Sequence, residues 1–209
     1  KTGATTLYQF GRKDAFPGVD ASKLAAGSHF TENASGNMSI KNGIQNPGSF
    51  YTWGSGSSWQ LNYSYYNLWS ADNTTTGYND NSVVKTVYDP SPVGFKMPAS
   101  NAFTGFTANG LNGGTKNVDG TDNSQTFGNN FGHNFWTNSS KTATINFPAS
   151  GERYSNDGSL YGVGSFGYFW SAVPASTGSG CSLDFGYVNV IPLSNSSRTY
   201  GFAARPVSE

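Results

Sequence analysis

The residues that could carry out chemistry in this sequence are few and widely spaced. Between residues 140 and 208 the acids are Glu152, Asp157 and Asp184. A glycosidase needs two carboxylates on either side of a cleft, and nothing in this spacing marks any two of them as a pair. The sequence therefore predicts no enzyme, and a carbohydrate-active enzyme with an exposed acidic pair remains the alternative.

The cysteine and histidine residues give little further evidence of a catalytic or metal site. Cys181 is the only cysteine, so an intramolecular disulfide, a cysteine zinc cluster and a two-cysteine redox site are excluded. His29 and His133 are the only histidines, and neither is near Cys181 in sequence. Cys181 is therefore interpreted as a small residue and not as a nucleophile.

Metal and cofactor signals are weak. Asp119, Asp122 and Asn123 lie in a glycine-rich segment and could supply oxygen ligands to calcium, but their spacing matches no complete calcium loop. We expect no metal and no cofactor. A separate aromatic tract could stack on sugars, but the favoured interpretation is hydrophobic filling beneath long loops. The tract consists of Trp53, Trp59, Tyr63, Tyr65, Tyr66 and Trp69.

Composition limits the classes of function. Charged residues make up 11% of the 209 residues and the formal net charge is zero, so nothing indicates binding to nucleic acid or to an anionic membrane. The 15% aromatic content argues against disorder. No apolar run is long enough to cross a bilayer, and the chain starts without a basic, hydrophobic leader. We expect a single domain over residues 1–209.

Turn residues are dense and long helical periodicity is missing. Two short helices are predicted, one near 20–26 with Asp20 as cap and one near 98–103. Strands are predicted near 7–10, 143–147, 168–172, 182–185, 187–191 and 201–207, with long ordered loops over about 105–140. The last four strands are expected to form one antiparallel sheet.

The segment 161–207 carries most of the functional information. Its only charged residues are Asp184, Arg198 and Arg205. Small polar residues separate a hydrophobic frame, which comprises Tyr161, Phe166, Trp170, Leu183, Phe185, Val188, Val190 and Leu193. Such a pattern favours a display surface over a catalytic centre. Alternation along a strand predicts that Trp170 is buried and that Phe169 faces the binding side.

Several motifs resemble one family. They are the run 87–99 (Val-Tyr-Asp-Pro-Ser-Pro-Val-Gly-Phe-Lys-Met-Pro-Ala), Phe103-Thr104-Gly105-Phe106, and the segments 147–153, 163–172 and 198–207. Together they resemble bacterial surface proteins with a C-type lectin-like fold. The terminal part also resembles the variable region of proteins diversified by diversity-generating retroelements. The calcium-dependent sugar-binding motifs of C-type lectins are absent from this sequence.

The resemblance implies a fold, a function and a set of varied residues. The fold would be α+β and C-type lectin-like, a twisted antiparallel sheet with two short helices and long ordered loops. The varied, ligand-binding positions would be Phe169, Val173, Ala175, Cys181, Ser182, Asp184, Gly186, Tyr187, Ile191, Ser194, Ser196, Ser197 and Tyr200. Each of these residue types can arise from an Asn codon by changes at its adenines alone.

The implied function is ligand recognition by a bacterial cell-surface adhesin or a phage receptor-binding protein. The partner would be a protein or glycan on another cell or surface. The location would be extracellular or cell-surface, anchored by lipid or borne on a fibre, or else the phage particle. A structural subunit of a surface fibre is a further alternative.

Overall fold

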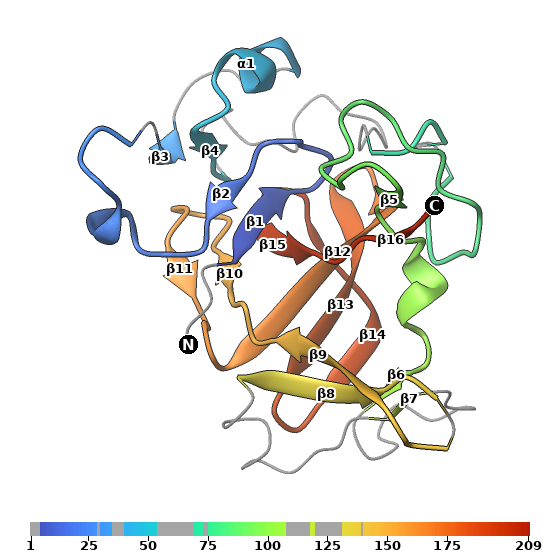
Figure 1. Cartoon of the computed structure of the whole chain (residues 1–209). Coiled ribbons are helices and arrows are strands. Elements are labelled where there is room, and N and C mark those ends of the chain that lie inside the picture. The colour runs from blue at the N-terminus through green and yellow to red at the C-terminus, as the bar shows by residue number, and fades with distance from the viewer. Residues whose placement is uncertain are drawn as a thin grey trace.

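The structure is a computed structural model that describes residues 5–28, 30–34, 40–53, 69–72, 75–107, 118–119, 131–138 and 140–209. Its centre is an eight-stranded sheet (Figure 1). The strands of this sheet are β1 (Thr6–Gln9), β2 (Phe16–Pro17), β10 (Glu152–Arg153), β11 (Leu160–Tyr161), β12 (Phe166–Ser176), β13 (Ser179–Gly186), β14 (Val190–Ser197) and β15 (Gly201–Ala204). The main path runs β11-β10-β15-β12-β13-β14, and β1 joins β15 to β2.

Four two-stranded sheets surround the central one. They are β3 (Thr31–Ala34) with β4 (Ser49–Tyr51), β5 (Phe95–Lys96) with β16 (Val207–Ser208), β6 (Phe106–Thr107) with β7 (Val118–Asp119), and β8 (Gly132–Trp136) with β9 (Thr144–Pro148). The described helices are α1 (Ile40–Gln45) and two 3₁₀ turns, η1 (Ala21–Lys23) and η2 (Ser100–Phe103). None of these helices has the length and apolar content needed to span a membrane.

The predicted α+β class with two short helices is wrong, because the described structure is mostly β. Both segments predicted to be helices form only 3₁₀ turns. Asp20 makes no side-chain cap hydrogen bond, and the cap residue of the second turn is Ala99, which has no polar side chain. An α-helix needs several residues fixed before it repays its nucleation cost, and these segments are too short and uncapped. The α-helix α1 instead includes Asn42 and Gly43, although the dipeptide Asn-Gly is typical of turns.

The central sheet also differs from the prediction in its strand directions. β13 pairs antiparallel with both β12 and β14, as expected. β15, however, pairs parallel with β12, through Phe169 with Ala203 and Trp170 with Ala204. β1 then pairs antiparallel with the other edge of β15. Of the long loops predicted over about 105–140, residues 108–117, 120–130 and 139 lie outside the described residues, whereas 132–136 form strand β8 and not a loop.

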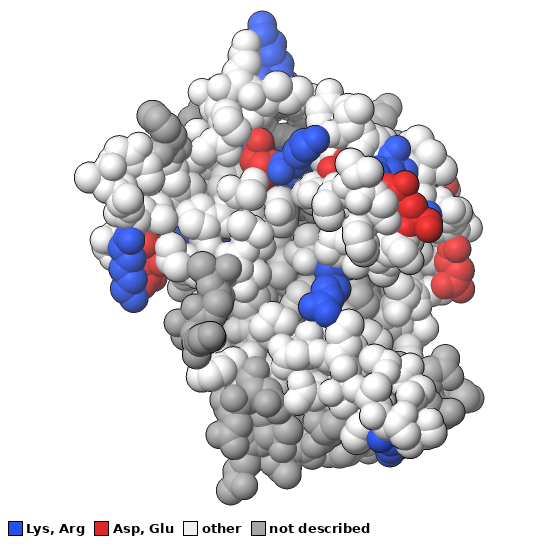
Figure 2. Space-filling view, viewed as in Figure 1, with Lys and Arg blue, Asp and Glu red and all other residues white. Residues whose placement is uncertain are grey.

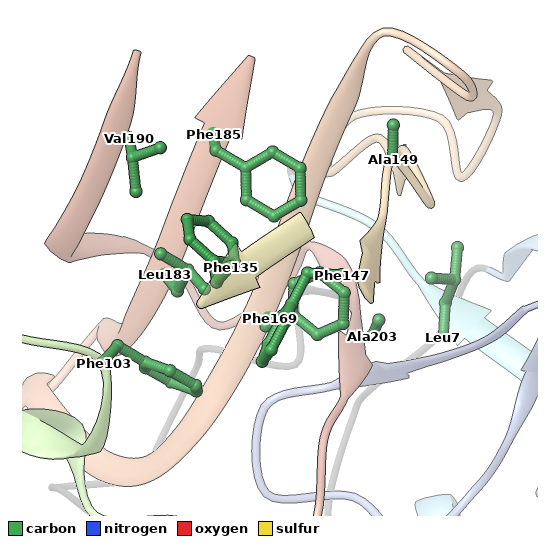
Figure 3. Close-up of a cluster of buried hydrophobic side chains, with 10 residues drawn as sticks. All are labelled: Leu7, Phe103, Phe135, Phe147, Ala149, Phe169, Leu183, Phe185, Val190 and Ala203. Carbon is green, nitrogen blue, oxygen red and sulfur yellow. The ribbon is translucent and has the colours of Figure 1, made fainter. Parts of the chain in front are cut away.

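One hydrophobic cluster fills the space between the central sheet and the β8–β9 hairpin (Figure 3). Phe135 of β8 and Phe147 of β9 contact Phe185 and Phe169 of the sheet at ring-centroid distances of 5.0 to 6.2 Å. The cluster consists of Leu7, Phe103, Phe135, Phe147, Ala149, Phe169, Leu183, Phe185, Val190 and Ala203. Burial of Leu183, Phe185 and Val190 confirms the prediction made for these frame residues.

A second cluster packs around Trp170, which is also buried as predicted. Its buried members are Phe10, Trp69, Val83, Met97, Trp170, Ala172 and Phe202. Because successive residues of a strand point to opposite faces, the two clusters cover both faces of β12. Outside the core the surface seen in Figure 2 carries only scattered charged side chains, as the low charge content requires.

Candidate ligand-binding face

The structure divides the predicted varied positions by accessibility. Tyr187 and Ile191 are exposed, at 51% and 43%. The half-buried positions are Ala175, Asp184, Ser194, Ser196, Ser197 and Tyr200. The buried positions are Phe169, Val173, Cys181, Ser182 and Gly186. The predicted set therefore does not form one continuous surface.

The expectation that Phe169 faces the binding side is wrong, because its side chain is only 2% exposed. Its ring stacks at 14° against that of Phe185 and contacts the edge of Phe147. Strand alternation correctly places Phe169 opposite Trp170. The β8–β9 hairpin covers the face that Phe169 occupies, so alternation alone could not identify the accessible side.

Asp184 is the charged residue at the centre of the predicted segment, and two serines hold it. Ser182 Oγ donates to Asp184 Oδ1 at 2.7 Å, and Ser194 Oγ donates to Oδ2 at 2.6 Å. Burial raises the pKa of Asp184, and these two hydrogen bonds oppose the rise. Asp184 pairs in register with Tyr168 on β12 and with Ile191 on β14, so these three side chains share one face of the sheet.

On this face lies a chain of aromatic rings, which we call the aromatic row. Its members, in order of contact, are Tyr154, Tyr200, Phe202, Tyr168, Phe166 and Tyr161. The shortest centroid distance is 4.8 Å, between Tyr168 and Phe202 at an interplanar angle of 19°. Phe202 is buried beneath its neighbours, whereas Tyr161 at one end is 59% exposed.

Glu152 lies beside the aromatic row, at the point where β15 passes from one partner strand to another. β15 pairs with β12 at Ala203 and Ala204, but with β10 at Gly201, opposite Arg153. Glu152 precedes Arg153 on β10 and pairs in register with Tyr161. Its side chain therefore lies on the same face of the β10–β11 pair as the exposed end of the row.

The environment of Glu152 is unusual for a carboxyl group. The residue is 6% exposed, and its carboxyl group makes no hydrogen bond and no ion pair with the described residues. Burial raises its pKa to about 7, and the charge of Asp184 adds to the rise. Burial also raises the pKa values of Tyr168 and Tyr200, and the charge of Glu152 contributes to both. We call Glu152 and Asp184 the acidic pair.

Sequence reasoning misses Glu152 and most of the aromatic row as parts of one face. The sequence pattern places Tyr161 and Phe166 in the buried frame, but both are exposed. The alternation of Phe166 and Tyr168 is visible in the sequence and places both on one side of a strand. Their assembly with Tyr154 depends on the pairing of β10 with β15, for which no local signal exists.

The motifs that carry the family resemblance have structural roles. Asp89 is buried, and its carboxylate accepts hydrogen bonds from the backbone N–H groups of Ser91 and Met97. Arg205 donates to the carbonyl of Asn146 and packs over a phenylalanine ring. Arg198 is buried and donates to the carbonyl of Ser176. Both arginines thus have structural roles, and the carbonyls that they bind belong to strands β9 and β12.

Of the other candidates, Cys181 is fully buried, and burial raises its pKa to about 12, as expected for an inert thiol. His133 is buried and its Nε2 bonds to the carbonyl of Gly186. No group of three or more metal-ligating side chains occurs within the described ranges. Asp122 and Asn123 lie outside the described residues, as does the part of the aromatic tract between Trp53 and Trp69.

The comparisons with known proteins give one match. The family model described as "Domain of unknown function (DUF8237)" matches residues 114–207, slightly less than half of the chain. Neither the curated proteins nor the solved structures contain a match to this chain. The matched range includes the aromatic row, the acidic pair and all of the predicted varied positions.

Proposed function

We propose that this chain is a non-catalytic ligand-binding domain that recognises its partner through the aromatic row and the adjoining strands β13 and β14. The observation that carries the proposal is the row itself, whose rings lie side by side on one sheet face. Aromatic side chains supply large contact area with little loss of conformational entropy, and they are enriched in recognition surfaces.

Exposed apolar residues lie on and next to the strands that adjoin the row, and one of them, Ile191, shares the face of Asp184. Tyr187 and Val188 follow β13, while Ile191 and Leu193 belong to β14, and all are exposed. A contiguous apolar patch on a protein surface is typical of a binding site. The low charge of the segment suits a surface whose partner is held by packing and hydrogen bonds.

We further propose that some positions on this face are diversified, as the resemblance to retroelement-diversified proteins implies. Tyr187 and Ile191 are exposed, so changing them costs little stability. A reverse transcriptase gene nearby, with an adenine-rich near-copy of the final coding segment, would support this proposal. A location on a bacterial surface or a phage particle is part of the same proposal.

The proposed binding function can be tested by screening the protein against large sets of glycans and peptides. Wild-type protein and a Tyr161→Ala/Ile191→Ala double variant would be screened on a glycan array and against a displayed peptide library. We expect wild-type hits whose binding falls at least tenfold in the double variant, because a few anchors dominate most interfaces. A Val93→Ala/Val87→Ala variant, changed at exposed valines elsewhere, is the control. Hits that survive in the double variant would place the site on another surface.

A carbohydrate-active enzyme is the second candidate, and one observation favours it. The charge of Asp184 raises the pKa of Glu152, so the acidic pair is electrostatically coupled. A carboxyl whose pKa is raised by burial and by a second carboxyl is a feature of the general acid in many glycosidases. Release of reducing ends from a polysaccharide panel, abolished by Glu152→Gln, would support the enzyme over the binding domain.

A further inference from the structure

Glu152 is a buried carboxyl group, and the proposed function does not explain how its negative charge is compensated. A buried carboxyl normally has hydrogen bonds or a cationic partner, because transfer from water is costly otherwise. Glu152 has neither among the described residues. Its neighbour Arg153 points to the other side of β10, where it donates to the carbonyls of Pro17, Val19 and Gly158 and to Glu32.

The groups around Glu152 add further negative potential. The charge of Asp184 on β13 raises the pKa of Glu152, and no cation within the described part of the chain offsets this effect. Tyr168 of β12 and Tyr200 lie near enough for the Glu152 charge to affect their pKa values. The faces of aromatic rings carry negative potential and attract cations. The surroundings of Glu152 would therefore attract a positively charged group.

The exposed residues around Glu152 indicate which kind of molecule would supply the positive charge. Exposed apolar side chains at Tyr161, Phe166 and Ile191 border the acidic pair, and aromatic residues are enriched in protein interfaces. Arginine suits such a place because its planar guanidinium stacks on aromatic rings and binds carboxylates through two parallel hydrogen bonds.

We propose that Glu152 and Asp184, with the aromatic row around them, form a receptor site for a basic side chain, preferably arginine, of a protein partner. This inference rests on the proposed binding function and names the partner chemistry. The basic group enters between the exposed rings and pairs with the Glu152 carboxylate. Asp184, already held by Ser182 and Ser194, contributes its field without moving.

The test selects a displayed random peptide library on three proteins: wild type, Glu152→Gln and Asp80→Asn. Glutamine keeps the shape of Glu152 and removes its charge. Asp80 is an exposed acid, so its variant controls for net charge. We expect arginine and lysine to be enriched in the wild-type and Asp80→Asn pools, and this enrichment to be lost on Glu152→Gln.

A selected peptide is then synthesised with arginine and with citrulline, which has the same shape without the charge. We expect citrulline to weaken binding to wild type by about tenfold or more, and to make little difference on Glu152→Gln. The melting temperature of Glu152→Gln shows that the variant is folded. Tyr161→Ala, which changes an exposed ring of the same site, should also weaken the arginine peptide.

The outcomes separate this inference from the function on which it rests. Peptides that bind the face without basic residues, and are lost on Tyr161→Ala, would overturn the basic-side-chain site and leave the binding function intact. Equal affinity of the arginine and citrulline peptides would also overturn it. Glu152-dependent binding of glucosamine oligomers, without any basic-peptide enrichment, would replace the protein partner by an amino sugar. An absence of any ligand for the face would contradict both proposals.

Discussion

Phe169 and Trp170 are adjacent in β12 but pack into different hydrophobic clusters. The Phe169 ring lies 5.0 Å from that of Phe147, and the Trp170 ring lies 4.2 Å from that of Phe202, both between centroids. The central strand of the sheet is thus covered on two faces at this level. On the face of Trp170, β12 becomes accessible again toward Phe166, whose side chain is 37% exposed.

Truncation of Phe169 therefore distinguishes a core position from the surface position that the resemblance implies. Phe169→Ala should lower the free energy of unfolding by about 3 to 5 kcal/mol, because it removes a buried ring and leaves a cavity. Urea denaturation followed by tryptophan fluorescence measures this change. Tyr187→Ala, at an exposed position, is the control and should stay within about 0.5 kcal/mol. If the two variants were equally stable, Phe169 would have to be assigned to the surface.

Arg153 should be a major determinant of stability. Its buried guanidinium donates to Glu32 and to three backbone carbonyls, so Arg153→Met leaves a carboxylate and several acceptors without their donor. We expect a loss of about 3 to 5 kcal/mol, measured by chemical denaturation. Lys23→Met removes one partner of an exposed ion pair with Asp20 and should cost less than about 1 kcal/mol. Equal losses would show that the Arg153 contacts contribute little.

Glu152 should make stability depend on pH in an unusual direction. Its folded-state pKa of about 7 lies above the ordinary value of 4.5, so the folded protein binds more protons between these values. This group therefore stabilises the fold below about pH 4.5 relative to high pH, and that contribution is lost as pH rises toward 7. The pKa of Asp184 is also raised in the folded protein, so its contribution to stability is likewise lost as pH rises.

The measurement compares the free energy of unfolding of wild type and Glu152→Gln at pH 5 and pH 8. The variant lacks the Glu152 titration, so we expect it to lose roughly 2 kcal/mol less than wild type between the two pH values. Asp157→Asn, at an exposed acid, is the control and should follow wild type. Parallel pH profiles for Glu152→Gln and wild type would contradict the raised pKa.

Cys181 should be unreactive in the native protein. Its side chain is fully buried and its pKa is raised to about 12. At neutral pH the thiol is therefore protonated, and reagents in solution cannot reach it. A colorimetric thiol reagent should modify it slowly in buffer and rapidly in denaturant. Rapid native modification would mean that position 181 is accessible, as the resemblance to variable proteins implies.

Some of the candidate site could be predicted because its signals are local. Alternation of apolar residues identifies β12 and β13 and the burial of Leu183 and Phe185. The resemblance adds Tyr187 and Ile191, which are accessible. The strand predicted at 187–191 is misplaced, because a turn separates β13 from β14 and the strand begins at Val190. Boundaries of this kind depend on the partner strand, which local pattern does not specify.

The sequence by itself determined the β-rich character of the terminal segment, the chemical inertness expected of a lone cysteine, and the low density of charge. Tertiary structure alone decided which side of each strand is covered, because the β8–β9 hairpin and the loop bearing Trp69 come from distant parts of the chain. It also decided that Glu152 lies with Tyr168 and Asp184. Periodicity defines two faces of a strand, but only long-range packing determines which of them meets water.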